Sequence, residues 1–376
     1  MDRPGFRPLT QVRELESRKT ELETCAYCPK LCRGACPVSE ASPNESLTPW
    51  GKMSGQYFLA RGDTSDASVT ANAFACTGCF GCREQCDHRN DVAGTLLDAR
   101  AGAFAKELSP PSVMRVVAKF EENERALRAF AESMNRSVGT ASGKRVALVV
   151  TASAIKHAPR SIEVGIKLLR RRYQITVLPV SSGVSLYYAG AREVLDEHLL
   201  TFAKEMGAID EAVFLEPGCA YLHARVLAAP PKEQETKANP RWKSRSIVEY
   251  AFEELRNLRA IENAPRVRYH DACQLGRGLG LYAEPRAVLT KLSGAAPLEF
   301  PRHHEHARCS GAGGLLPVTF PEVSREMASR RLAEPLEFLD EEKATVITAC
   351  PSSLRSFRKV GEAEDFLEWV GRGLGP

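Results

Sequence analysis

The sequence predicts an α+α/β protein, in which an all-helical segment precedes tandem α/β units. Residues 9–134 show helical patterns and contain no convincing strand. From residue 144 onward, short β-rich apolar runs alternate with helical patterns, and the order of these elements repeats, ending on AVFLEPGC in one copy and TVITACPSS in the other. We therefore expect two domains, at 1–140 and 141–376, with the repeats at about 144–228 and 265–372 of the second.

The helical segment carries recognisable start and stop signals. Residues 9–23 are charged with helical spacing, which predicts an exposed lead-in helix. Thr48 followed by Pro49 predicts an N-cap and a first helical position for a helix that runs to about residue 60. A helix is expected near 92–108, and the following Ser-Pro-Pro should end it and begin a long helix at 112–134.

The second segment predicts a mostly parallel sheet, because its strands alternate with helices. The expected strands are 145–150, 175–180, 212–216, 267–271 and 345–349, and the expected helices are 161–172, 186–206, 247–258, 285–292 and 321–336. The polar, proline-bearing stretch 230–245 is interpreted as an exposed connection.

Composition excludes several classes of protein. The net charge of +4 is small for 376 residues and the acids are interspersed with the bases, so nucleic acid is not expected as a partner. Neither a membrane-spanning apolar run nor a secretory signal is recognisable, which makes the cytoplasm the expected location, with a peripheral place on the inner face of a membrane left open. Twelve cysteines in a reducing compartment favour metal binding or redox chemistry over disulfides.

Eight of the cysteines form two tight groups. The second group, Cys76-x2-Cys79-x2-Cys82-x3-Cys86, has the bacterial ferredoxin spacing, and the first, Cys25-x2-Cys28-x3-Cys32-x3-Cys36-Pro, has one extra residue. The fourth cysteine of such a run binds the other cluster. The spacing therefore predicts two [4Fe–4S] clusters, with two crossed ligand sets: Cys25, Cys28, Cys32 and Cys86 for one, and Cys76, Cys79, Cys82 and Cys36 for the other. Two four-cysteine zinc sites are the alternative, although zinc ribbons separate their cysteine pairs more widely.

The other four cysteines are single. Cys219, Cys273, Cys309 and Cys350 each lie near an expected strand end, where sites form in open α/β sheets. Their contexts are EPGC, HDAC, CSGAGG and CPSS. Three histidines, His303, His304 and His306, precede Cys309 and are interpreted as exposed, with contact to a metal or a quinone-like acceptor as the alternative.

Together these motifs resemble the cysteine-rich (CCG-domain) family of heterodisulfide reductase-related iron–sulfur proteins, which includes the iron–sulfur subunits of anaerobic glycerol-3-phosphate dehydrogenase and glycolate oxidase. The resemblance covers nearly the whole chain. It implies an all-helical two-cluster ferredoxin domain followed by two Rossmann-like cysteine-rich α/β repeats, each with a single cysteine, a CCG motif and a CPxC-like end.

This chain departs from that pattern. Cys309-Ser310-Gly311 stands at one CCG position and Ser181-Ser182-Gly183 at the other, while Cys350-Pro-Ser-Ser and Glu216-Pro-Gly-Cys219 stand at the CPxC positions. The full motifs support a noncubane cluster pair that cleaves disulfides, and too few thiolates remain here for that chemistry. The four C-terminal cysteines are instead candidate ligands of a third [4Fe–4S] cluster, and a vestigial module with buried, inert thiols is the alternative.

The expected function is that of an electron-transfer subunit, because no nucleophile–base pair or carboxylate pair stands out and no residue is assigned a catalytic role. Electrons would pass between an FAD-containing flavoprotein dehydrogenase, or another redox subunit, and a quinone, a membrane partner or a soluble carrier. Two alternatives remain. One is a heterodisulfide reductase-like subunit that reduces disulfides at a C-terminal cluster, and the other is a zinc-stabilised interaction protein.

Overall fold

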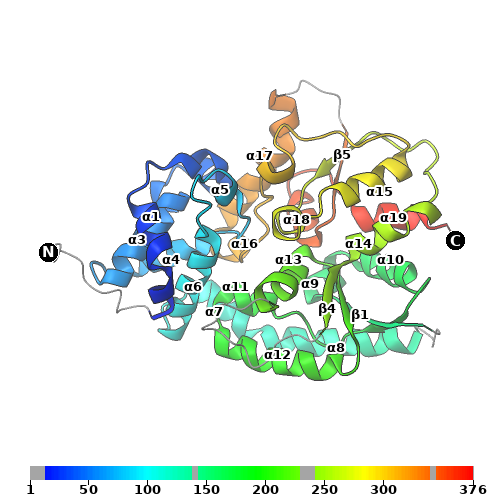
Figure 1. Cartoon of the computed structure of the whole chain (residues 1–376), viewed down its shortest axis with the longest axis horizontal. Coiled ribbons are helices and arrows are strands. Elements are labelled where there is room, and N and C mark those ends of the chain that lie inside the picture. The colour runs from blue at the N-terminus through cyan, green and yellow to red at the C-terminus, as the bar shows by residue number, and fades with distance from the viewer. Residues whose placement is uncertain (1–12, 138–142, 229–241, 339–343, 376) are drawn as a thin grey trace. The chain divides into compact units, whose positions relative to one another are not determined.

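A computed structural model describes residues 13–137, 143–228, 242–338 and 344–375 (Figure 1). The chain forms two compact units. The first comprises Met1–Ala118, Ser185–Arg192 and Gly311–Met327, and the second comprises Lys119–Val184, Glu193–Ser310 and Ala328–Pro376. The protein thus mixes a helical unit with parallel sheets, as the sequence predicts. The domain limits expected from the sequence stay a prediction.

The described residues of the first unit form helices and connecting segments and include no strand. Its elements are η1 (Arg13–Arg18), α1 (Lys19–Ala26), η2 (Leu31–Ala35), α2 (Pro37–Ala41), η3 (Glu45–Leu47), α3 (Pro49–Arg61), α4 (Ala67–Asn72), η4 (Ala73–Ala75), α5 (Gly81–Glu84), α6 (Val92–Ala105), α7 (Pro111–Ala118) and α16 (Leu316–Thr319), with most of α11 (Val184–Ala189). The predicted cap is present, because the Thr48 hydroxyl accepts a hydrogen bond from the Gly51 N–H at 3.0 Å and Pro49 begins α3.

The core of the first unit is small and borders the cysteines. Leu22 of α1, Met53 and Tyr57 of α3 and Leu96 of α6 are buried together, with Cys25 in the same cluster. Cys76 and Cys82 are partly buried and pack against the same cluster. The core of the first unit therefore lies next to cysteines of both sequence groups.

The second unit contains two parallel sheets. The first has the strand order β2-β1-β3-β4 and the second β5-β6-β7, and all neighbouring strands run parallel. The strands are β1 (Arg145–Val149), β2 (Gln174–Val177), β3 (Glu211–Phe214), β4 (Lys243–Ser246), β5 (Val267–His270), β6 (Thr345–Thr348) and β7 (Glu364–Asp365). The helices are α8 (Phe120–Ser137), α9 (Ala152–His157), α10 (Pro159–Leu169), α12 (Arg192–Met206), α13 (Pro217–Tyr221), α14 (Ile247–Glu253), α15 (Ala283–Ser293), α18 (Pro351–Phe357) and α19 (Phe366–Gly373), with η5 (Leu222–Leu227), η6 (Leu255–Asn257), η7 (Gln274–Gly278) and η8 (His304–His306). Helix α17 (Pro321–Phe338) begins in the first unit and ends in the second.

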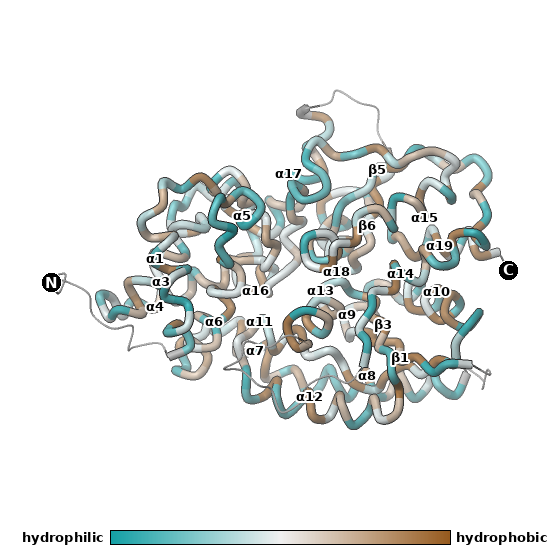
Figure 2. Tube along the Cα trace, viewed as in Figure 1, coloured by the Kyte–Doolittle hydropathy of each residue, from teal (hydrophilic) through white to brown (hydrophobic). Residues whose placement is uncertain are grey.

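Helices cover both faces of the first sheet. Val146 and Leu148 of β1 join a core cluster with Ile166 of α10, whereas Ala147 of β1 joins another with Phe202 of α12. Figure 2 shows hydrophobic and hydrophilic residues alternating along α12, which buries one side only. Burial on both faces of β1 explains the uninterrupted apolar run VALVV that follows Arg145.

Several expected elements differ in the structure. The long helix expected at 112–134 is two helices, α7 and α8, and the helix expected at 186–206 is interrupted between α11 and α12, where Gly190 adopts a φ of 80°. The connection expected at 230–245 is partly wrong, because its last residues form the polar strand β4. An edge strand needs only backbone pairing, so its composition gave no strand signal. Residues 230–241 of that connection and residues 9–12 of the lead-in helix lie outside the described residues.

Candidate metal centres

One cavity of the first unit brings together cysteines from both sequence groups. Its walls include the four cysteines Cys36, Cys76, Cys79 and Cys82. Apolar residues such as Val38 complete the wall, and Lys52 is the cation that lines it. The cavity thus collects four thiols, which is the donor number and type that a [4Fe–4S] cluster takes.

The backbone beside this cavity is shaped by a glycine. Gly78 has a φ of 68°, and its N–H donates a hydrogen bond to the Cys76 sulfur at 3.4 Å. Burial raises the pKa of Cys76, while Lys52, Arg100 and the Gly78 N–H oppose that shift. Burial also raises the pKa of Cys82 well above its usual value, and the neighbouring thiols add to the rise. These thiols therefore need a cation to hold them as thiolates, which is what a metal centre supplies.

A second group of cysteines gathers around Cys25. Burial raises the pKa of Cys25 to about 12, and the thiols of Cys32, Cys86 and Cys28 contribute to the rise. The side-chain N–H of Asn90 opposes it by donating to the Cys25 sulfur at 3.0 Å. Cys86, from the second sequence group, thus lies beside thiols of the first group.

The two thiol groups are neighbours within the first unit. Burial raises the pKa of Cys32 to about 11, and the next largest contribution comes from Cys36, which lines the other site. A [4Fe–4S] centre needs four thiolates and N–H donors to sulfur, and both places provide four thiols and one such donor. The donor sets present fit such clusters.

The C-terminal cysteines lie in the second unit. Cys219 lies in α13 and Cys350 is the N-cap of α18, and burial raises the pKa of both thiols, to about 12 for Cys350. The Glu216 carboxyl raises both pKa values further, and Cys350 also contributes to the shift of Cys219. The structure therefore brings Cys219, Cys350 and a carboxyl group together.

Cys273 and Cys309 are tied to this pair less directly. Cys273 is the N-cap of η7, a π-helix that packs against α13. Cys309 is buried, and the next residue, Ser310, shares a 2.8 Å hydrogen bond with Ser353 in the first turn of α18, the helix that follows Cys350. Both serines stand where the family pattern has cysteine, so a hydrogen bond occupies the place of two thiolates.

Sequence reasoning did not single out Glu216 as a functional residue. Its carboxylate accepts hydrogen bonds from Ser352 at 2.8 Å and Thr151 at 3.4 Å, and burial raises its pKa. The available signal was its position, because it stands where the first cysteine of the CPxC-like motif is expected.

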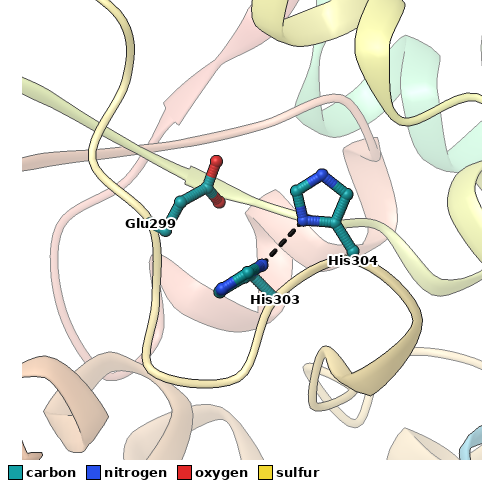
Figure 3. A group of neighbouring side chains, drawn as sticks. All are labelled: Glu299, His303 and His304. Atoms are coloured by element: carbon teal, nitrogen blue, oxygen red, sulfur yellow. Dashed lines mark hydrogen bonds between the residues drawn. The ribbon is translucent and has the colours of Figure 1, made fainter.

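The histidines before Cys309 form a polar cluster, in which the facing ring nitrogens of His303 and His304 lie 2.7 Å apart and Glu299 is close by (Figure 3). The Glu299 carboxylate already accepts two hydrogen bonds from Arg286, each 2.7 Å long. A guanidinium held there opposes a bound cation, so we assign no metal to this cluster. His270 is also engaged, because its Nδ1 accepts a 3.2 Å hydrogen bond from the buried Arg331.

Comparison with known proteins supports the identity of both regions. Residues 21–90, which contain all eight clustered cysteines, match the family model of a 4Fe-4S dicluster domain. Residues 267–357 match the model of the CCG cysteine-rich domain and contain Cys273, Cys309 and Cys350. Among the helices that the structure describes, none combines the length and hydrophobicity needed to span a bilayer.

Curated relatives belong to redox systems. The chain is 23% identical to a subunit of the fumarate reductase (CoM/CoB) of Methanothermobacter marburgensis over 350 residues, which cover 88% of this chain and 66% of the relative. It is 32% identical to a subunit of the dihydromethanophenazine:CoB–CoM heterodisulfide reductase of Methanosarcina barkeri over 113 residues, or 29% of this chain and 28% of that one. It is 30% identical to the probable iron-sulfur-binding oxidoreductase FadF of Bacillus subtilis over 99 residues, or 26% of this chain and 14% of that one.

The chain therefore spans less than two thirds of the length of these relatives. The resemblance seen in the cysteine motifs is confirmed. The chain is related to heterodisulfide reductase subunits, and it contains regions that match a 4Fe-4S dicluster domain and a CCG cysteine-rich domain.

Proposed function

We propose that the chain is the electron-transfer subunit of an oxidoreductase and carries two [4Fe–4S] clusters in its first unit. Cys25, Cys28, Cys32 and Cys86 would hold one, and Cys36, Cys76, Cys79 and Cys82 the other. The observation that carries the proposal is the cavity in which Cys36 meets the three cysteines of the second group. That crossing is what the ferredoxin spacing rule requires.

The residues around the clusters would insulate them and adjust their potentials. When bound, each cluster supplies a one-electron couple. Buried apolar side chains such as Val38 and Val92 exclude water from the cavity. The N–H groups of Gly78 and Asn90 stabilise negative charge on sulfur.

A partner is proposed at each end of the electron path. The named relatives include subunits of fumarate reductase and heterodisulfide reductase and an oxidoreductase, which suggests a redox partner. We propose an FAD-containing dehydrogenase, or another redox subunit, as donor and a quinone, a membrane-bound protein or a soluble carrier as acceptor. Contact with a membrane surface would then be peripheral.

For the second unit we propose a third [4Fe–4S] cluster on Cys219, Cys273, Cys309 and Cys350. The proximity of Cys219 to Cys350 and the packing of η7 on α13 support it. Disulfide reduction in this unit is the second candidate function, supported by the relatives' names alone. The serines at positions 310 and 353 count against it, because they replace two of the expected thiolates.

The deciding experiment is the iron, sulfide and zinc content of anaerobically purified protein, with EPR before and after dithionite. About eight iron per chain supports two clusters, and about twelve iron with a third reducible signal supports the third. Cys219→Ser should then remove only that third signal. Stoichiometric zinc without iron would overturn the proposal in favour of a zinc-stabilised interaction protein.

The crossed ligand sets need a further pair of variants. Cys36→Ser should weaken the same EPR signal as Cys79→Ser, and Cys86→Ser the same signal as Cys28→Ser. If Cys36→Ser instead matches Cys28→Ser, each sequence group binds its own cluster. Turnover of a disulfide with a reduced dye would establish the second candidate function.

A further inference from the structure

Two cations are buried in the first unit beside the Cys76 group. Lys52 of α3 and Arg100 of α6 are each 1% exposed. Lys52 lines the cavity of the four cysteines, and its Nζ donates to the Ala75 carbonyl at 3.3 Å. Arg100 donates to the Cys76 carbonyl at 2.5 Å, so it lies against the backbone of a proposed ligand.

The hydrogen bonds of Arg100 are complete. Its five N–H groups make five hydrogen bonds to four backbone carbonyls, those of Ala73 (twice), Cys76, Tyr188 and Gly314. Carbonyls satisfy the N–H groups without neutralising the charge. Among the described residues, no carboxylate pairs with either Arg100 or Lys52.

The other cations next to the cysteines of the first unit differ from these two. Arg33, next to Cys32, is exposed and paired with Glu45. Arg83 and Arg89 both pair with Glu84. Because carboxylates pair with these cations and solvent screens them, they have little electrostatic effect on a buried cluster. The unpaired buried cations of the first unit therefore gather on one side, next to Cys76.

An unpaired buried cation is unfavourable unless an anion lies nearby, because desolvating a charge costs several kcal/mol. Thiolate is the anion that the surroundings offer. Lys52 lies in the wall of the cavity that collects four thiols, and Arg100 donates to the backbone of one of those cysteines. A cluster with four thiolate ligands carries net negative charge, and one more electron adds to it.

We propose that Lys52 and Arg100 are the countercharges of the cluster held by Cys36, Cys76, Cys79 and Cys82, and that they keep its reduction potential above that of the other cluster. The inference rests on the proposed function, since it requires both clusters. Two positive charges stabilise the reduced state more than the oxidised state, so one added electron resides mainly at this cluster. This order of potentials makes the Cys76 site the place where the chain holds its electron between donor and acceptor.

Lys52 offers the cleaner test, because Arg100 also anchors two chain segments through the Tyr188 and Gly314 carbonyls. The experiment compares Lys52→Met and Lys52→Gln with wild type by EPR-monitored redox titration of the full chain. Lys52→Arg keeps the charge, and Arg33→Met removes an exposed, paired cation next to a ligand of the other set. Signals are assigned with the Cys79→Ser and Cys28→Ser variants.

Both neutral variants should lower the potential of the Cys76 cluster. At a fixed solution potential the reduced-to-oxidised ratio should fall about tenfold, equivalent to about 59 mV for a one-electron couple. Lys52→Arg and Arg33→Met should leave both potentials in place, and Arg100→Lys should stay near wild type. The Gln variant keeps a donor for the Ala75 carbonyl, so it remains informative if the Met variant fails to fold.

The possible results distinguish the countercharge role of Lys52 and Arg100 from the presence of the two clusters. Unchanged potentials in a fully loaded neutral variant, or equal shifts of both clusters, would overturn the countercharge assignment and leave the proposed function standing. Wild-type protein that binds zinc and no iron would instead defeat the proposed function itself.

Discussion

The two units surround their cysteines with opposite charges. In the first, the buried cations Lys52 and Arg100 lie beside Cys76 and have no carboxylate partner among the described residues. In the second, the buried Glu216 carboxyl lies beside Cys219 and Cys350 and raises their pKa values. A cluster with four thiolates is anionic, so the first environment favours it and the second opposes it unless Glu216 is protonated.

The difference shows that the number of cysteines indicates cluster binding less well than the groups that surround them. Both units have at least four cysteines, yet only the first combines dense ligand spacing, N–H donors to sulfur and buried positive charge. The second unit replaces thiolates by hydrogen-bonded serines. Four experiments test this difference between the two units.

Removal of iron should have the largest effect and should be confined to the first unit. Chelation after oxidation leaves Lys52 and Arg100 without a countercharge, and we expect α1, α3 and α6 to lose roughly 3–5 kcal/mol of protection. Hydrogen exchange should show β1 and β3 still protected, because the second unit has its own apolar core. Equal loss of protection in both units would contradict the comparison.

Arg286→Met tests how much a buried ion pair contributes to the stability of the second unit. Arg286 donates to both oxygens of the buried Asp271 at 2.8 Å and also pairs with Glu299. Removing it leaves an uncompensated buried carboxylate, so the second unit should lose about 3–5 kcal/mol of unfolding free energy in urea. Arg325→Met, which breaks an exposed pair with Glu322, should cost less than about 1 kcal/mol. A similar loss in both variants would refute the role of burial.

Asp365 should make the unfolding free energy of the second unit depend on pH. Burial raises its pKa to about 6, opposed by hydrogen bonds from the Ser161 hydroxyl and the Leu367 N–H. The folded state therefore binds the proton more tightly than the unfolded state, whose pKa is near 3.8. The resulting stability is complete below pH 3.8 and is lost as the pH rises through 6, by about 3 kcal/mol in total.

Asp365→Asn should abolish that dependence. The variant should be up to about 3 kcal/mol more stable than wild type at pH 7.5 and no more stable near pH 3.5, as measured by urea unfolding at both values. Exchange rates in the first unit should not change. A constant difference between the variant and wild type across this pH range would argue against Asp365 as the titrating group.

Thr48→Ala should have the smallest effect. The hydroxyl caps α3, the helix that carries Lys52, and loss of such a cap costs about 1 kcal/mol. Hydrogen exchange of the Gly51 and Lys52 amides should report the loss, and Thr48→Ser should retain most of the protection. An undisturbed α3 in the Ala variant would mean that tertiary contacts alone hold this end of the helix.

Much of the fold was predictable from local patterns. The strands at 145–149 and 267–270 and the cap at Thr48 were readable because apolar runs and capping residues act over a few positions. Strand β4 was missed because Lys243–Ser246 has no apolar signal and depends on pairing with β3. The helix break at Gly190 was missed because a single glycine is tolerated in many helices.

The kind of chemistry could be predicted from the sequence, because the spacing of eight cysteines restricts which metal centre can form. It could not determine which charges face that centre. Lys52 and Arg100 look like ordinary surface cations in the sequence, and Glu216 like a residue at a motif edge. Only the tertiary structure buried them next to thiols. Burial depends on residues far apart in the chain, and burial gives a charge its effect on a neighbouring sulfur.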